Sequence, residues 1–304
     1  AWANSLFEDN AEYGYGMARA VDYRRAALKS DVETLISDPA TPVDVVTAAK
    51  AWLAAFDSAA ASRTTGENLI KAIKGHAATP LTDRIVFAGD ITGKKSVWAL
   101  GGDGWAYDIG FAGLDHVVAQ NVDINILVMD TECYSNTGGH VSKATPLGAV
   151  MKYAADGKRT YKKDLGRMMM TYGNVYVASV ALGANFQQTI NALMEAEAYP
   201  GPSIVIAYCP CINHGIRSGM SHSIVEEKLA VKAGYWPIYR FNPSNPEPLT
   251  VDAPAPDGSL ITFINGEDRY ADLRMFDPHE ASILQPDLQK RTEHIYEILK
   301  SLSK

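Results

Sequence analysis

Two loops rich in glycine and oxygen-bearing residues, each directly after a short apolar run, constrain what this chain can fold into. The first run, Val-Trp-Ala-Leu at 97–100, ends in Gly-Gly-Asp-Gly at 101–104. The second, at 124–129, ends in Asp-Thr-Glu-Cys-Tyr-Ser-Asn at 130–136. The intervening residues have a helical pattern with apolar positions at Ile109, Leu114, Val117 and Val118. A strand, helix and strand of this length form a βαβ unit with parallel neighbouring strands. We therefore expect both loops at the carboxyl edge of an open α/β sheet, where ligands bind.

The chemistry that these loops suggest is a diphosphate held through a metal ion. Glycines beside Asp103 let the backbone approach phosphate oxygens, and the helix after Gly104 presents free N–H groups to the same anion. Asp103 is a hard oxygen ligand suited to Mg²⁺, and a second set of oxygen ligands follows about 28 residues later. The alternative is an ordinary strand-to-helix turn with Asp103 as its N-cap, because short glycine motifs often occur by chance. The spacing of the second loop favours the diphosphate.

The pattern resembles the GDG…N motif of thiamine-diphosphate enzymes, and the likeness extends well beyond it. The segments that carry it are WANSLFEDNAEYGYGM at 2–17, GGDGWAYDIG at 101–110, DTECYSNTGG at 130–139 and AYCPCINHG at 207–215, with LDHV, SKATP and GAV between them. Together they resemble the C-terminal thiamine-diphosphate domain of pyruvate:ferredoxin (flavodoxin) oxidoreductases. The resemblance implies an α/β fold with a mostly parallel central sheet and helices on both faces. It implies a cofactor domain at 1–245 and a tail at 246–304 that packs on it or on a partner.

The resemblance assigns roles to residues of both loops. It implies Mg²⁺ ligands at Asp103, at Thr131 (where the broader motif has Asn) and at the backbone carbonyl of Cys133, whose side chain we expect to be a small buried group. The expected cofactor-binding residues are Gly102, Asp103, Gly104, Trp105, Thr131, Cys133, Tyr134, Ser135 and Asn136. Asn136 is also the expected catalytic residue, because its amide can hydrogen-bond the substrate or a developing oxyanion. Its alternative role is that of a turn residue in Ser-Asn-Thr-Gly-Gly.

A Cys-Pro-Cys segment follows the strand that we expect at 203–208. Two thiolates do not complete a tetrahedral metal site, so the residues alone indicate that Cys209 and Cys211 are a buried pair. The resemblance instead implies that Cys211 is one of four ligands of a [4Fe–4S] cluster, with the other three upstream of this chain. We do not expect Cys209 to be a ligand, and we expect His214 to be a satisfied polar residue near the site.

The remaining segments predict further α/β elements. We expect helices within 17–75, interrupted at 38–42, and an Ala-rich helix at 43–61. A helix from 186 should bury Phe186, Ile190, Leu193, Met194 and Ala198. Further strands are expected at 175–182, 236–241 and 260–263, and further helices at 223–233 and 295–302. Residues 147–172 read as a basic helix, either solvated or a docking surface for an acidic electron carrier. Its cations are Lys152, Lys158, Arg159, Lys162, Lys163 and Arg167.

Composition excludes several classes of protein. The chain is 47% hydrophobic and 21% charged, which is typical of a soluble globular protein, and its net charge of −7 argues against nucleic acid as a partner. No apolar stretch is long enough to cross a membrane, and we expect no signal peptide. Three cysteines do not make a disulfide framework, so a reducing, cytoplasmic setting fits best. Because the likeness is already in progress at residue 2, we expect a C-terminal part of a longer enzyme.

The resemblance implies an oxidoreductase of anaerobic metabolism. Its reaction is the oxidative decarboxylation of pyruvate with coenzyme A, and its electrons pass through iron–sulfur clusters to ferredoxin or flavodoxin. Expected partners are those molecules, the upstream domains and a second copy in a homodimer, and we expect the chain alone to be inactive. Three alternatives stay open: the same chemistry on another 2-oxo acid, a non-catalytic fragment that binds thiamine diphosphate or a redox partner, and a thiamine decarboxylase without electron transfer, which would not need Cys211.

Overall fold

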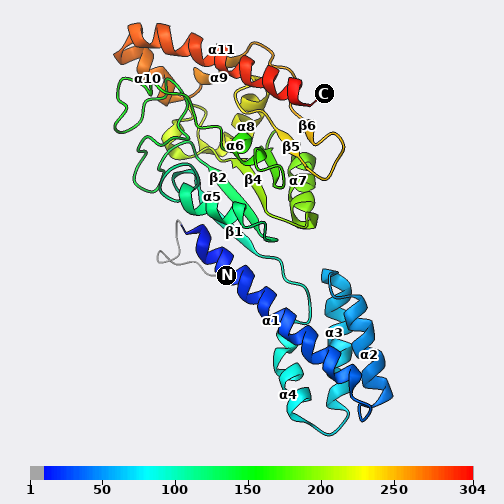
Figure 1. The fold of residues 1–304 in the computed structure, drawn as a ribbon. Helices are drawn as coiled ribbons and strands as arrows, with labels where there is room; N and C mark the ends of the chain where they lie inside the picture. The colour runs from blue at the N-terminus through cyan, green and yellow to red at the C-terminus, as the bar shows by residue number, and fades with distance from the viewer. Residues whose placement is uncertain (1–9, 304) are drawn as a thin grey trace. The chain divides into compact units, whose positions relative to one another are not determined.

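The computed structural model describes residues 10–303, and the contacts within the chain divide it into two compact units (Figure 1). Unit 1 comprises the described residues up to Gly14 and from Trp98 onward, and unit 2 is Tyr15–Val97. Each has a hydrophobic core of its own. Residues 246–303, which the sequence suggested as a tail, belong to unit 1 together with the sheet. The start of the segment at 2–17, which carries part of the family likeness, lies outside the described residues.

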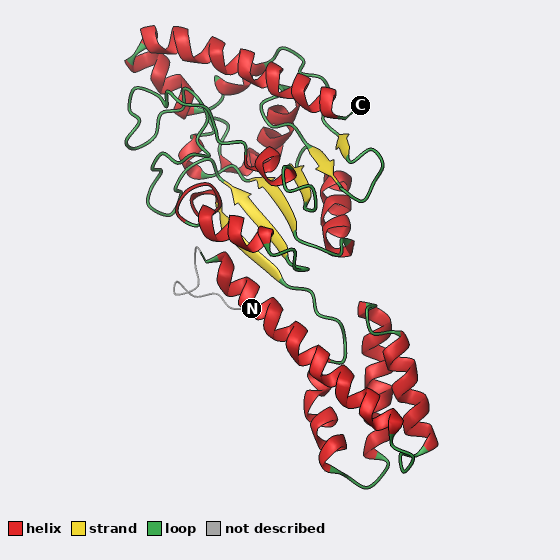
Figure 2. Ribbon diagram, viewed as in Figure 1, coloured by secondary structure: helices red, strands yellow, loops and turns green. Residues whose placement is uncertain are grey.

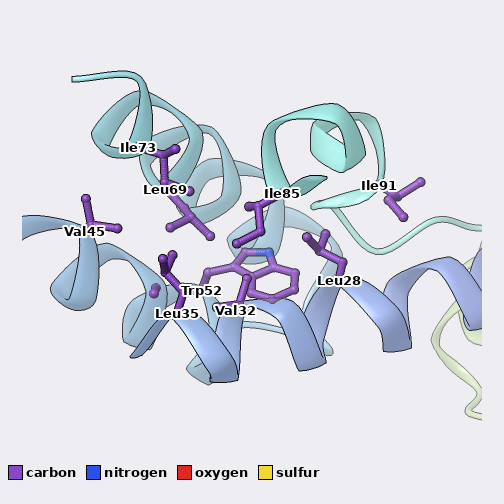
Figure 3. Close-up of a cluster of buried hydrophobic side chains, with 10 residues drawn as sticks. Leu28, Val32, Leu35, Val45, Trp52, Leu69, Ile73, Ile85 and Ile91 are labelled. Carbon is purple, nitrogen blue, oxygen red and sulfur yellow. The ribbon is translucent and has the colours of Figure 1, made fainter. Parts of the chain in front are cut away.

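Unit 2 is helical. Its elements are α1 (Ala11–Ser37, from Tyr15 onward), α2 (Val43–Ala54), α3 (Ala59–Lys74), α4 (Pro80–Phe87) and η1 (Ala88–Ile91). The expected break at 38–42 is confirmed, but the expected helix at 43–61 ends at Ala54, because Ser58 caps a new helix by accepting a hydrogen bond from the Ala61 N–H. Trp52 is fully buried at the centre of the core, among Leu28, Val32, Leu35, Val45, Leu69, Ile73, Ile85 and Ile91 (Figure 3).

Unit 1 is built on a six-stranded sheet with the order β1-β2-β4-β3-β5-β6 (Figure 2). The strands are β1 (Trp98–Gly102), β2 (Asn125–Asp130), β3 (Tyr176–Val180), β4 (Ser203–Tyr208), β5 (Tyr239–Phe241) and β6 (Leu249–Val251). β1, β2, β4 and β3 pair in parallel, and β5 and β6 add an antiparallel edge. The predicted α/β class, the mostly parallel sheet and the βαβ unit are therefore confirmed. The strand β6 was not foreseen.

Helices flank this sheet (Figure 2). They are η2 (Gly104–Ile109), α5 (Phe111–Ala119), α6 (Leu165–Met170), α7 (Phe186–Ala198), η3 (Ile212–His214), η4 (Met220–His222), α8 (Ser223–Lys232), α9 (Leu260–Ile264), α10 (Asp268–Phe276) and α11 (Pro278–Leu302). α7 contacts β3 and β4. Its expected buried face is partly wrong, because Phe186 and Met194 are 64% and 66% exposed. The small side chains Ala192 and Ala196 face the sheet instead and allow close packing.

Three further expectations are corrected. Residues 147–172 are helical only at α6, and the rest is an ordered loop in which Gly148 and Gly157 have φ of 76° and 75°, which no helix accommodates. The apolar run at 260–263 lies in helix α9, because a run of four cannot distinguish a strand from a buried helix. Ile109 is 66% exposed, because η2 intervenes before α5 begins. Across residues 10–303, every helix is too short or too polar to span a lipid bilayer.

Candidate functional site

An open cleft of about 590 Å³ lies at the carboxyl ends of β1 and β2. It is lined by residues 100–105, 109, 129, 131, 133–137 and 209. Every residue that the sequence suggested for cofactor binding, from Gly102 to Asn136, is among them. Cys211, suggested for a cluster, is not part of this lining but lies beside it through its contact with Cys133. The parallel pairing of β1 with β2 explains the convergence, because both strands end at the same edge of the sheet.

Three oxygen atoms from the two loops come together at the floor of the cleft. The Thr131 hydroxyl lies 2.7 Å from Asp103 Oδ1 and 3.0 Å from the carbonyl oxygen of Cys133. Neighbouring oxygens around an octahedral Mg²⁺ are about 2.9 Å apart, since each lies about 2.05 Å from the ion. One carboxylate, one hydroxyl and one carbonyl at such separations form a donor set of the kind that a hard cation prefers. No group of three or more His, Cys, Asp or Glu side chains elsewhere in residues 10–303 offers a metal site.

Asp103 is buried, with 1% of its surface exposed. Burial raises the pKa of its carboxyl to about 7, with a further rise from the charge of Asp130 and partial relief from the Thr131 and Ser142 hydroxyls. Ser142 Oγ donates to Asp103 Oδ2 at 2.9 Å, a contact that the sequence did not reveal. A carboxylate that is this costly to ionise is stabilised by a cation at its free lone pairs.

The first loop requires glycine for steric reasons. A Cβ on Gly104 would lie 2.4 Å from the ring of Tyr134, and one on Gly101 would lie 2.3 Å from the ring of Trp105. At Gly102, by contrast, a Cβ would meet nothing within 4 Å, so this residue faces open space in the cleft. Trp105 is buried, and its indole N–H has no hydrogen-bond partner among the described residues. The loop therefore combines a tightly packed base with a bare backbone surface that an anion could approach.

The second loop turns back on itself beyond Tyr134. The Tyr134 N–H donates to the His140 carbonyl at 2.9 Å, and the Gly139 N–H donates to the Tyr134 carbonyl at 3.0 Å. Asn136 lies at the exposed tip, and its side chain makes no hydrogen bond to another described residue. Asn136 does not have a positive φ, which among the non-glycine residues of this loop belongs to Glu132 at 58°. The Asn136 amide is thus available to a molecule in the cleft.

A buried ionic network beneath the second loop was not foreseen from the sequence. Glu132 is 1% exposed and accepts hydrogen bonds from Lys162 at 3.0 Å, Arg269 at 2.8 Å and Tyr235 at 2.6 Å. Lys162 also pairs with the fully buried Asp130 at 2.7 Å. Burial alone would raise the pKa of Glu132, but the charges of Lys162 and Arg269 outweigh it and lower that pKa to about 2.

This network corrects the interpretation of 147–172 as a solvated basic face. Lys162 donates to carboxylates inside unit 1, and Lys158, which is 8% exposed, donates to the Thr145 carbonyl at 2.5 Å. The acidic residues beside Thr131 were visible in the sequence, but their cations lie 30 and 137 residues further along the chain. No local pattern connects such distant positions. The one feature of the sequence that could have indicated buried lysines here is the presence of glycines within the lysine-rich segment.

The cysteines occupy distinct environments. The sulfur atoms of Cys133 and Cys211 lie 3.8 Å apart. The hydrogen bond from Cys133 lowers the pKa of Cys211 to about 5, opposed by burial and aided by Ser135 and Asn213. Burial raises the pKa of Cys209 to about 12. The lowered pKa favours the thiolate form of Cys211, and a thiolate is the form that binds iron. A [4Fe–4S] cluster needs four such ligands, and Cys211 is the one that the sequence led us to expect in this segment.

His214 is fully buried beside the second loop. Its Nε2 lies 3.0 Å from the Thr131 carbonyl, which can only accept, so Nε2 carries the proton. Burial lowers the pKa of His214 to about 3 and keeps the ring neutral. Its Nδ1 lies 3.6 Å from Glu267 Oε1, and neither atom has another partner among the described residues. His214 therefore supports the backbone at Thr131.

Comparison with known proteins agrees with this geometry. Residues 85–207 match the family described as thiamine pyrophosphate enzyme, C-terminal TPP binding domain. The chain is 48% identical over 289 residues to the pyruvate-flavodoxin oxidoreductase of Klebsiella pneumoniae and 49% identical over 294 residues to the pyruvate:ferredoxin oxidoreductase of Moorella thermoacetica. Each alignment covers 93% of this chain and 25% of the relative. The chain thus spans about a quarter of the length of these relatives.

Two more distant similarities accompany these. The NADP⁺-dependent pyruvate dehydrogenase of Euglena gracilis is 40% identical over 293 residues, which cover 95% of this chain and 16% of that protein. The solved structure of the 2-oxoglutarate:ferredoxin oxidoreductase from Magnetococcus marinus aligns with 38% of this chain and 40% of its own, with 24% identity and a TM-score of 0.36. On the sequence relationships, residues 85–207 carry the C-terminal domain of thiamine pyrophosphate enzymes, in a chain related along almost its whole length to the pyruvate:flavodoxin and pyruvate:ferredoxin oxidoreductases.

Proposed function

We propose that this chain supplies the thiamine-diphosphate and Mg²⁺ site of an enzyme that oxidatively decarboxylates pyruvate. Coenzyme A accepts the acetyl group, and ferredoxin or flavodoxin accepts the electrons. The observation that carries the proposal is the convergence of Asp103, Thr131 and Cys133 oxygens in a cleft lined by all the residues that the sequence suggested for cofactor binding. The names of the relatives supply the substrate and the acceptors.

In this proposal the metal is held by Asp103 Oδ1, Thr131 Oγ1 and the carbonyl oxygen of Cys133. The donor set is hard and carries a single negative charge, which leaves room for diphosphate oxygens to complete the coordination of Mg²⁺. The diphosphate would lie against the bare backbone at Gly102, where the cleft is open. Thiamine diphosphate, when bound, supplies an electron sink for the decarboxylation of a 2-oxo acid.

The chain's own residues then have defined tasks. Asn136 presents a neutral amide at the rim of the cleft and would donate to substrate oxygens without titrating. His214, neutral and hydrogen-bonded to the Thr131 carbonyl, holds the metal-binding loop in place. The Glu132 network fixes the same loop from beneath. No side chain of the described cleft is assigned as a general base, because the groups that would contact the aminopyrimidine ring are expected in the upstream part of the longer enzyme.

The proposal extends to electron transfer and assembly. Cys211 would provide one thiolate ligand of a [4Fe–4S] cluster, and three further cysteines would come from upstream segments, in line with relatives about four times as long. Electrons would leave one at a time along such clusters. We propose a cytoplasmic homodimer in which this chain is inactive without the upstream domains.

Calorimetric titration of the chain with thiamine diphosphate and MgCl₂ tests the proposal. We expect saturable binding that requires both components and is lost in Asp103→Ala, because that substitution removes the only carboxylate of the donor set. Asp115→Ala is the matched control, since Asp115 lies on α5 and accepts a hydrogen bond from the Tyr172 hydroxyl at the surface. Equal binding by wild type and Asp103→Ala would refute the metal assignment. Absence of binding in both would show that this chain alone does not form the site.

A further inference from the structure

The proposed function assigns no covalent step to the contact between Cys133 and Cys211. Their sulfur atoms lie 3.8 Å apart, which is van der Waals contact, whereas a disulfide bond requires about 2.05 Å. Cys133 is 1% exposed, and Cys211 is only half-buried. Asn213 Nδ2 also donates to the Cys211 sulfur at 3.7 Å. Cys211 is therefore the more accessible residue of the pair, and Cys133 lies in contact with it.

The backbone fixes this proximity. Asp130 on β2 and Tyr208 on the adjacent parallel strand β4 lie opposite each other in the sheet. Cys133 follows Asp130 by three residues, and Cys211 follows Tyr208 by three residues. The Cys209 N–H donates to the Asp130 carbonyl at 2.9 Å, which extends the pairing of the strands toward both cysteines. The contact thus follows from the sheet register. Cys209 itself lines the cleft, and its sulfur has no hydrogen-bonding contact with either of the other two cysteines.

We propose that Cys133 and Cys211 are a redox pair that closes to a disulfide when Cys211 binds no iron. The oxidant is a low-molecular-weight disulfide. The sulfur of Cys211, the more accessible residue, attacks one sulfur of the oxidant, which releases one small thiol and leaves a mixed disulfide on Cys211. The sulfur of Cys133 then attacks that of Cys211 and releases the second small thiol. Two electrons and two protons pass from the protein thiols to the oxidant, which becomes two thiols.

The disulfide would control the availability of Cys211. This consequence rests on the proposed function, in which Cys211 is a cluster ligand, because a sulfur bound in a disulfide cannot coordinate iron as a thiolate. It also keeps the sulfur of Cys211 from irreversible oxidation to the sulfinic and sulfonic acids. Reduction by cellular thiols restores the ligand. Disulfides in reducing compartments are typically of this transient, regulatory kind.

Mass spectrometry of the full 304-residue chain, oxidised anaerobically with glutathione disulfide, tests the pair. In the wild type we expect the mass to fall by that of two hydrogen atoms, with one of the three thiols still free and the peptides of Cys133 and Cys211 joined. Dithiothreitol should reverse the change. In Cys133→Val the second step is impossible, so the glutathione adduct on Cys211 should accumulate and the cross-link should disappear.

Two further variants keep the result interpretable. Cys209→Ser is the matched control and should form the same cross-link as the wild type. Cys133→Ser, which is nearly isosteric, should behave like Cys133→Val and guards against misfolding of the valine variant. A stable glutathione adduct in the wild type, or a cross-link between Cys209 and Cys211, overturns the proposal. Asp103→Ala should still form the disulfide, so failure of cofactor binding and failure of the redox pair are separate results.

Discussion

The residues that the sequence suggested for the cleft lie together because they directly follow two strands that pair with each other. Asp103 and Thr131 each follow the end of an apolar run, and parallel pairing of the two strands brings them within 2.7 Å of each other. The residues that reasoning from the sequence missed act over long separations. Glu132 was visible beside Thr131, but its partner Arg269 lies 137 residues later. Periodicity and motif spacing describe neighbours along the chain, so they could not identify this pair.

The residue-scale prediction concerns Glu267. Burial raises its pKa from 4.5 to about 7, and the charges of Glu132 and Glu226 add to the rise, whereas Arg269 opposes it. Between these two values the folded chain binds more protons than the unfolded chain, so Glu267 makes the free energy of unfolding decrease as the pH rises from 4.5 to about 7. In Glu267→Gln, which cannot titrate, that decrease should be smaller.

Urea unfolding at several pH values between about 5 and about 8 measures this effect. The difference in unfolding free energy between wild type and Glu267→Gln should shift in favour of the variant as the pH rises. Glu280→Gln serves as the control, since its ion pair with Arg159 involves a largely exposed guanidinium. A constant difference across the pH range would contradict the assignment of a raised pKa to Glu267.

At the scale of elements, the turn from β1 into η2 has no room for a side chain at Gly104 but has room for one at Gly102. A methyl group on Gly104 would collide with the Tyr134 ring at 2.4 Å, whereas one on Gly102 would enter open space. Gly104→Ala should therefore lower the free energy of unfolding by about 1–3 kcal/mol. Gly102→Ala should leave stability almost unchanged and weaken thiamine-diphosphate binding, because the methyl group occupies the space proposed for the diphosphate.

Thermal or urea unfolding, combined with the calorimetric titration, separates the two effects. Gly173→Ala is unsuitable as a control because its φ of 73° would itself cause strain, whereas Gly16→Ala in α1 meets nothing within 4 Å and lies far along the chain from the cleft. If Gly102→Ala bound the cofactor as tightly as wild type, the diphosphate would have to lie elsewhere in the cleft.

The type of element was predictable where an apolar run had a clear length and boundary. The strands that became β2 and β4 were identified almost to the residue, because six-residue runs rich in β-branched side chains between turn residues favour buried strands. The short run in α9 was ambiguous. Residues 147–172 were mistaken for a helix because their lysines resembled a solvated face, whereas Lys162 is held inside unit 1 by two buried carboxylates. Ion pairs with residues distant in the sequence determine the conformation of that segment, and local helix propensity contains no information about them.

At the scale of the whole molecule, the segment after residue 245 is hydrogen-bonded to the loop at 130–136 that is proposed to bind the cofactor. Arg269, on α10, is 3% exposed and donates to both Glu132 and Glu267 at 2.8 Å. Arg269→Met should leave both carboxylates without their guanidinium and lower the free energy of unfolding by about 3–5 kcal/mol, as breaking buried ion pairs does. Cofactor affinity should also fall, because the loop that carries Thr131 and Cys133 loses a support.

Denaturant unfolding and calorimetry of Arg269→Met, Arg269→Lys and Arg217→Met measure the two effects. Arg217 pairs with Asp268 at the surface, so its loss should change stability by less than about 1 kcal/mol. Arg269→Lys keeps the charge and should recover part of the affinity. Wild-type affinity in Arg269→Met, once folding is verified, would mean that α10 only stabilises unit 1 and does not influence the loop.

The separation of Glu132 from Arg269 also sets an order of events during biosynthesis. A ribosome adds about 5–20 residues per second, so the 137 residues between them take on the order of ten seconds to emerge. During that interval the acidic loop has been made but lacks the guanidinium that neutralises it in the finished protein. The loop that is proposed to receive the cofactor is therefore completed only after Arg269 has been made, and a translation product interrupted between the two residues would carry Glu132 without this partner.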